Sequence, residues 1–188
     1  MQESYARKIL YSQRTKLFPS GALSNSKKSD KYVKLARKLG VDAKAIPISN
    51  IFFDDRALLK CEGCGSYGGH WLCPPNVMKP AEFKRILKNY HSAVLTHSND
   101  AGKLRDVMYQ LESKAFVDGK YWAFAFFPDF CCAKCSYPSF CKNPGMDRPM
   151  LHSHGIDEYK TARKAGFKVY PLRNKDERPN RLGLLLID

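Results

Sequence analysis

The sequence predicts an α/β fold, in which helices flank a mixed β-sheet. Segments with apolar residues at helical spacing alternate along the chain with short apolar runs bounded by turn residues, which is typical of α/β proteins. The 188 residues are 44% hydrophobic and 27% charged, the balance of a globular chain large enough for one apolar core. We therefore expect a single α/β domain over residues 30–188, preceded by a basic, loosely attached N-terminal arm over residues 1–29.

A helix and a strand are predicted first after the arm. The helix combines a capping residue, one apolar face and a terminal glycine, which are Asp30, then Val33, Ala36 and Leu39, and finally Gly40. Residues 51–59 predict a strand or hairpin that turns at Asp54 and Asp55.

Two helices and two strands are predicted in the middle of the chain. One helix starts at Pro80, a residue suited to a first helical turn, and the other starts after Asp100, a suitable N-cap. Their apolar faces consist of Phe83, Ile86, Leu87 and Tyr90 in the first helix and Leu104, Val107, Met108 and Leu111 in the second. Residues 92–96 and 121–127, which follow these helices, predict strands.

The C-terminal part predicts one more helix and a closing pair of strands. The helix covers residues 157–165 and ends at Gly166, and the strands cover residues 167–172 and 182–187. Two cysteine-rich segments then fall at the ends of predicted strands, where α/β sheets commonly carry ligand sites.

Six of the seven cysteines form two clusters, each with a Cys-x2-Cys step. The first cluster is Cys61-x2-Cys64-x8-Cys73, and the second is Cys132-x2-Cys135-x5-Cys141. A Cys-x2-Cys step lets a tight turn direct two thiolates at one metal, as in zinc and iron–sulfur sites. We therefore predict a metal cofactor bound by Cys61, Cys64, Cys73, Cys132, Cys135 and Cys141. Cys131 is left out because neighbouring residues of an extended chain point in opposite directions.

The pattern favours iron–sulfur over zinc. Pro74 directly follows Cys73, as a proline follows the last ligand in bacterial ferredoxins, and aromatic residues surround both clusters. One four-iron cluster needs four thiolates, whereas two clusters need eight and would leave one iron without a cysteine, because the chain has seven. Zinc remains the alternative cofactor, since Cys61, Cys64, His70 and Cys73 have the composition of a Cys3His site.

No motif of a common nucleotide-binding or hydrolytic enzyme is present. The sequence has no P-loop, no G-x-G-x-x-G and no G-x-S-x-G element. His152 and His154 are suited to bind a metal or carry protons, although such a pair more often lies in a polar loop. Arg148 is suited either to an anionic ligand or to a structural ion pair. Catalytic residues stay unassigned, and the sequence leaves open whether the protein is an enzyme.

The charge is strongly basic, with 32 Lys and Arg against 18 Asp and Glu and a net charge of +14. Such a field attracts acidic partners or polyanions. No secretory signal and no apolar run long enough for a membrane are seen, so we expect reduced cysteines, a cytoplasmic location and no membrane contact.

Three functions fit these observations. The preferred one is an iron–sulfur protein of the four-iron type that transfers electrons or takes part in redox chemistry, with an acidic redox protein as partner. The alternative is a structural zinc module that binds nucleic acid through the basic arm. A thiol-redox protein, whose Cys-x2-Cys pairs cycle with disulfides, ranks third.

Two ordered blocks of the sequence resemble a known family. Residues 61–75, CEGCGSYGGHWLCPP, form the first block. The second runs from Cys132 through Cys141 and Arg148-Pro149 to Gly155-Ile156-Asp157. Both resemble motifs of an uncharacterised cysteine-rich family of predicted metal-binding proteins, and the resemblance extends from about Val33 to the C-terminus. It implies metal binding, with iron–sulfur as the expected group, in archaeal or bacterial cytoplasm, but no reaction, because the family has none assigned.

Overall fold

The computed structural model describes residues 25–130, 132 and 134–188. Residues 1–24, which make up most of the predicted arm, lie outside the described residues, and so do residues 131 and 133.

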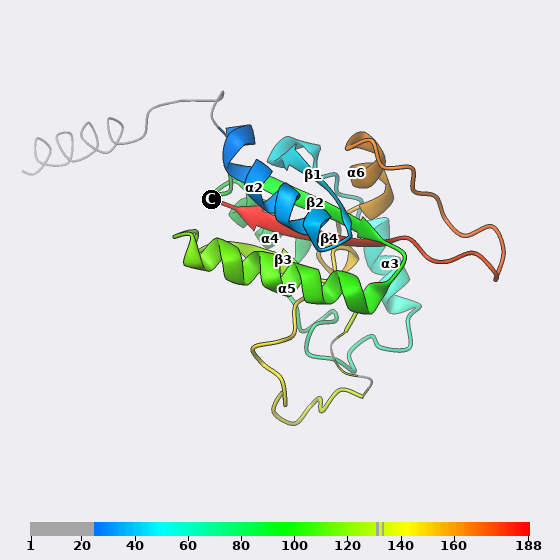
Figure 1. Cartoon of the computed structure of the whole chain (residues 1–188). Coiled ribbons are helices and arrows are strands. Elements are labelled where there is room, and N and C mark those ends of the chain that lie inside the picture. Colours follow the sequence, from blue (N-terminus) through cyan, green and yellow to red (C-terminus); the bar gives the residue numbers. More distant parts are fainter. Residues whose placement is uncertain (1–24, 131, 133) are drawn as a thin grey trace, which may run out of the picture.

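Four strands form one sheet: β1 (Asp42–Pro47), β2 (Ser92–Ser98), β3 (Phe124–Phe126) and β4 (Arg181–Ile187). Their order is β1-β2-β4-β3, and each adjacent pair is antiparallel. The α/β class is therefore confirmed, but the sheet is antiparallel rather than mixed. The reason is β4. Strands β2 and β3 run in the same direction, but the last strand of the chain enters between them in the opposite direction (Figure 1).

Helices cover both faces of this sheet. α2 (Asn25–Lys38) and α5 (Ala101–Val117) pack on one face, and α4 (Pro80–Leu87) and α6 (Glu158–Lys164) pack on the other. Successive strand residues point to opposite faces, so the central strands contribute to both cores. Val94, Leu185 and Ile187 enter the first core, whereas Ala93, Leu95, Leu184 and Leu186 enter the second. Burial on both faces explains why these strands are continuous apolar runs.

Three helices confirm the predictions closely. The Asp100 carboxylate caps α5 by accepting the Lys103 N–H, and the Asp157 carboxylate caps α6 by accepting the Lys160 N–H. Pro80 is the first residue of α4. The four apolar residues expected inside α5 are buried, namely Leu104, Val107, Met108 and Leu111. In α4, Phe83 and Leu87 are buried, while Ile86 and Tyr90 are half-buried.

The strand predicted over residues 51–59 is wrong. Phe53 makes a single bridge to Ile156, and α3 (Arg56–Glu62) follows. The Asp54 carboxylate accepts the N–H of Arg56 at 3.0 Å, so the expected turn leads into a helix instead of reversing a hairpin. The first cysteine cluster therefore follows a helix, not a strand.

The strand predicted over residues 167–172 is also not formed. Both edges of β4 are taken by β2 and β3, which leaves it no edge for a second C-terminal strand. In contrast, β1 has no counterpart among the predicted strands, because only Ala43 and Ile46 of its six residues are buried. A short 3-10 helix, η1 (Ile48–Asn50), follows it.

α2 includes the last five residues of the predicted arm. Ser29 is fully buried, and its hydroxyl lies 2.8 Å from that of Ser92 on β2. Asp30 therefore lies inside the helix rather than at its N-cap. None of the helices in the described part of the chain has the length and apolar character that crossing a membrane requires.

Two long loops lie together on one side of the sheet (Figure 1). The first cysteine loop (residues 61–79) starts in the last turn of α3 and ends at α4. The second cysteine loop (residues 127–149) leaves β3 and leads to a 3-10 helix, η2 (His152–His154).

Candidate metal centre

The first cysteine loop is a series of hydrogen-bonded turns. The Cys64 N–H donates to the Cys61 carbonyl at 3.0 Å, and the Asn76 N–H donates to the Cys73 carbonyl at 2.8 Å. A further bond of 2.9 Å from the Gly68 N–H to the Pro74 carbonyl joins the two halves of the loop. Cys61 and Cys73 are buried, whereas Cys64 is exposed.

Burial raises the pKa of two of these thiols. The pKa of Cys61 is raised by burial and then by the nearby Cys64. Burial raises the pKa of Cys73 to about 11, and the charges of Cys61, Cys64 and Cys135 act in the same direction. Because Cys135 belongs to the second cysteine loop, the two loops lie within electrostatic reach of each other. Both buried thiols are protonated near neutral pH, so a metal must displace their protons to bind.

In the second cysteine loop, each predicted ligand sulfur accepts an N–H group. The Tyr137 N–H donates to the Cys135 sulfur at 3.4 Å. Asn143 donates twice, through its backbone N–H to Cys141 at 3.4 Å and through its side-chain amide to Cys132 at 3.1 Å. N–H groups aimed at sulfur stabilise the thiolate form and adjust the electronic properties of a bound metal centre.

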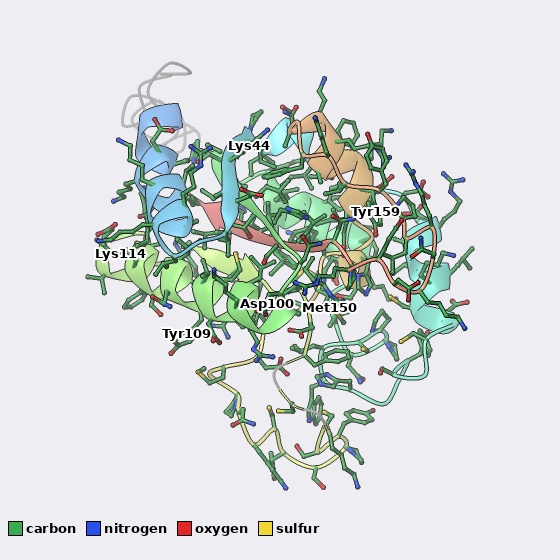
Figure 2. The ribbon with its side chains drawn as sticks, turned by 45° about the vertical axis from the view of Figure 1, so that its right-hand side comes forward. Lys44, Asp100, Tyr109, Lys114, Met150 and Tyr159 are labelled. Atoms are coloured by element: carbon green, nitrogen blue, oxygen red, sulfur yellow. The ribbon has the colours of Figure 1, made fainter. Side chains whose placement is uncertain are left out.

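Aromatic contacts hold the two loops side by side. The Trp71 indole N–H donates to the Ser139 carbonyl at 3.0 Å, and the Trp71 ring meets Tyr137 edge-on at 4.9 Å between centroids. The His70 ring stacks on Phe130 at 4.0 Å. Figure 2 shows both loops on the side of the molecule away from Lys44 and Tyr159.

A cavity of about 250 Å³ lies at the junction of the two loops. Its lining includes three cysteines of the second loop, one histidine of the first and one carboxylate, which are Cys132, Cys135, Cys141, His70 and Asp147. The structure thus brings together the three second-loop cysteines and places part of the first loop against them.

His70 is buried and has its two ring nitrogens in different roles. Nδ1 accepts the Leu72 N–H at 3.1 Å, so the proton of the neutral ring lies on Nε2. Burial lowers the pKa of His70 against the opposing effect of Asp147, whose Oδ2 lies 4.0 Å from Nε2. Nε2 therefore carries a hydrogen in this arrangement and has no free lone pair to offer a metal. The Cys3His zinc site that the sequence left open stays a prediction.

Two arginines attach the second cysteine loop to the sheet. Arg148 makes a bidentate ion pair with Glu112 of α5, with a closest distance of 2.8 Å, and Glu112 also accepts the Ala125 N–H. Arg105, also on α5, donates to the Phe130 carbonyl at 2.9 Å. Of the two roles that suited Arg148, the structure shows the ion pair. The sequence contained one indication of this contact, because Glu112 is a carboxylate within the predicted apolar face of a helix and so needs a charged partner.

The two histidines of η2 differ in their surroundings. His154 packs edge-on against Phe83 and Phe126, and burial lowers its pKa to about 4. Its role is structural. Burial alone would lower the pKa of His152. The 2.7 Å contact with Glu158 outweighs burial, so the pKa of His152 is raised. His152 does not line the cavity between the cysteine loops but a different cavity, which α3 and α6 also line.

The structure brings Cys132, Cys135 and Cys141 to one cavity, but it does not place the first-loop cysteines there. Within residues 25–130, 132 and 134–188, no three His, Cys, Asp or Glu side chains are arranged as a metal-ion site. Convergence of the six cysteines on one or two centres therefore stays a prediction. Cys131 lies outside the described residues.

One comparison with known proteins finds a match. A family model described as "Predicted metal-binding protein (DUF2284)" matches residues 44–187, which include both cysteine loops. No curated protein and no solved structure matches this chain.

Proposed function

Because this chain belongs to the DUF2284 family of predicted metal-binding proteins, we propose that it is an iron–sulfur protein of the four-iron type that acts in electron transfer or redox chemistry. The observation that carries this proposal is the set of N–H groups that meet the sulfurs of Cys132, Cys135 and Cys141. Iron–sulfur centres use such bonds to set their reduction potential.

Three cysteines from each loop would hold the group: Cys61, Cys64 and Cys73 from the first, and Cys132, Cys135 and Cys141 from the second. A bound cluster would supply one-electron transfer. The chain's own contribution is to hold the thiols, direct N–H groups at them and limit water. Phe130 and Tyr137, which pack against His70 and Trp71, serve the last purpose at the junction of the loops.

An acidic redox protein is the partner that the charge favours. Lys31, Lys34 and Lys38 are exposed along α2, although Lys31 already pairs with Asp118 at 2.7 Å. Neutralising Lys34 and Lys38 should slow reduction by an acidic partner at low salt and have little effect at high salt. Equal rates at both salt concentrations would remove the basis for this partner.

The test of the proposal is the iron, sulfide and zinc content of protein purified without oxygen, together with its visible spectrum. About four irons and four sulfides per chain mean one cluster shared by the loops, and about eight of each mean two. A colourless protein that carries zinc would overturn the proposal.

Serine variants then distinguish one shared cluster from two. Cys64→Ser and Cys135→Ser alter one predicted ligand in each loop, and Cys131→Ser is the matched control, since it changes the cysteine outside the predicted set. With a shared cluster, each ligand variant loses the whole visible spectrum. With two clusters, each loses about half. Full retention of colour in either ligand variant would contradict the assignment of that cysteine.

A further inference from the structure

A second cavity, larger than the one between the cysteine loops, lies between α3, η2 and α6. Its volume is about 530 Å³, within the usual range of small-molecule sites. None of the six cysteines that the structure describes lines it. Its walls are apolar where Ala57 of α3 faces Ile156, Tyr159 and Pro171. Such walls suit the body of an organic ligand rather than a bare ion.

Most charged groups around this cavity already have partners. Arg56 makes a bidentate ion pair with Asp54. The Asp157 carboxylate caps α6 by accepting the Lys160 N–H. Glu158 accepts from His152. These contacts hold the three carboxylates of the wall in place.

Lys60 is the exception. It lies on α3 at the edge of the cavity, and no ion pair joins it to another of the residues that the structure describes. The cavity therefore presents one ammonium group that none of these ion pairs holds, beside an apolar wall.

His152 supplies a second polar group in a fixed orientation. The Glu158 carboxylate accepts both the His152 backbone N–H at 3.1 Å and the ring Nδ1 at 2.7 Å. Because Nδ1 carries the proton that Glu158 accepts, Nε2 is left for a ligand. When His152 is charged, Nε2 carries a hydrogen and can donate it to a carboxylate. When His152 is neutral, Nε2 is an acceptor and can bind the hydrogen of a carboxylic acid.

We propose that this cavity binds a small organic monoanion, a carboxylate with an apolar body. The carboxylate contacts Lys60 and His152, and the body lies against Ile156, Tyr159 and Pro171. Cys61 directly follows Lys60 in α3, and the charge of Glu158 acts on the Cys61 thiol, so the ligand lies beside the first cysteine loop. This site goes beyond the proposed redox function, because binding of the anion needs no metal.

Three probes test the proposal on the full-length protein with its metal content as purified. Benzoate has both the charge and the apolar body, acetate has only the charge, and benzyl alcohol has only the body. Ligand-observed NMR should give a Kd of about 1 mM for benzoate, an ordinary value for so small a ligand. Acetate and benzyl alcohol should bind at least about tenfold more weakly. No saturable benzoate binding, or equal binding of all three probes, would overturn the proposal.

Variants locate the bound probe. Lys60→Gln should weaken benzoate binding about tenfold, while Lys60→Arg, which keeps the charge, should weaken it little. His152→Asn should also weaken it, and benzoate should shift the His152 ring signals of the unmodified protein. Lys88→Gln, at an exposed lysine outside this cavity, is the control and should have no effect. Benzoate binding that is the same in Lys60→Gln and Lys88→Gln would place the ligand elsewhere. A lack of iron would overturn the proposed function and leave this result unchanged.

Discussion

The sheet with its helices and the pair of cysteine loops are built in different ways. The central strands of the sheet bury apolar residues on both faces, including Leu95, Leu184 and Leu185 with no exposed surface. The cysteine loops contain no strand among their described residues and leave large aromatic side chains exposed, with Phe140 95% and Trp71 38% exposed. Turns, aromatic contacts and ion pairs with α5 hold them instead.

This difference separates folding from function. Burial of apolar surface stabilises the sheet without any bound group. Of the described loop residues, only Phe127 enters either apolar core, and the buried thiols of Cys61 and Cys73 keep their protons near neutral pH unless a metal replaces them. The sheet therefore has a core of its own, and we expect the two loops to depend more on a bound metal for their stability.

Metal removal is the strongest way to test this contrast. Treatment with a chelator and an oxidant should reduce amide hydrogen-exchange protection in residues 61–79 and 127–149 by at least about tenfold and leave β2 and β4 protected, because the metal links loops that have little core of their own. Exchange measured by mass spectrometry before and after removal gives the answer. Equal loss of protection in the sheet would show that the two regions are one unit.

His154 makes stability depend on pH in the sheet region. The unfolded chain binds a proton at this histidine below pH 6.5, whereas the folded protein does so only near pH 4. Its contribution is therefore present in full above pH 6.5 and is lost as pH falls toward 4, by about 3 kcal/mol in the unfolding free energy. Urea denaturation followed by far-UV circular dichroism at pH 7 and pH 4.5 measures this loss.

His154→Phe is the matched variant, because a phenyl ring can pack between Phe83 and Phe126 without titrating. It should lose clearly less stability than the unmodified protein over the same pH range. An identical pH dependence in both proteins would contradict the assigned role of His154.

His152, whose pKa is raised, acts with the opposite sign, since its contribution to stability is lost as pH rises.

The Arg148–Glu112 ion pair joins the two regions, so breaking it should release the second loop from the sheet. Glu112→Gln keeps an oxygen for the Ala125 N–H but loses the charge that holds Arg148. We expect a loss of about 2 kcal/mol and faster proteolysis within residues 127–149. Lys31→Gln, which removes an exposed lysine from its pair with Asp118, is the control and should cost less than about 1 kcal/mol. Unchanged cleavage of the loop would argue against the attachment.

A glycine-to-alanine substitution, made once in the sheet and once in the second cysteine loop, should give the smallest loss of stability among these tests. At Gly183 in β4, an added Cβ would come within 2.7 Å of the Met108 side chain and 2.8 Å of the Thr96 hydroxyl. Gly183→Ala should therefore cost about 1 to 2 kcal/mol, because the buried Met108 and Thr96 side chains must shift. At Gly145, in the second loop, an added Cβ would have no described atom within 4 Å apart from its chain neighbours, and Gly145→Ala should be nearly neutral. Thermal denaturation of both variants checks the pair, and equal effects would contradict it.

The helices were predictable because their signals are local. In α5, the Asp100 cap and the buried face of Leu104, Met108 and Leu111 lie within a few turns of one another in the sequence. The wrong strands depended on distant partners. Residues 167–172 have strand-like composition, but both edges of β4 are already paired. The composition of a segment does not show which strand edges are available to it.

The candidate site divides in the same way. The spacing of Cys61, Cys64 and Cys73, and of Cys132, Cys135 and Cys141, indicates a metal because a Cys-x2-Cys step is a local arrangement. The contact of Trp71 with Tyr137 and the stacking of His70 on Phe130 depend on the packing of loops far apart in the sequence. No spacing rule could supply them.

By itself, the sequence determined the α/β class, most of the helices, the caps of α5 and α6, and the two cysteine clusters, because each rests on residues a few positions apart. Only the tertiary structure decided that β4 enters between β2 and β3, that Arg148 pairs with Glu112 and that a cavity forms beside Lys60 and His152. These features join residues far apart in the chain. The packing of the whole domain determines which distant residues meet, because strand edges, charged groups and apolar surfaces must all be paired in the same structure.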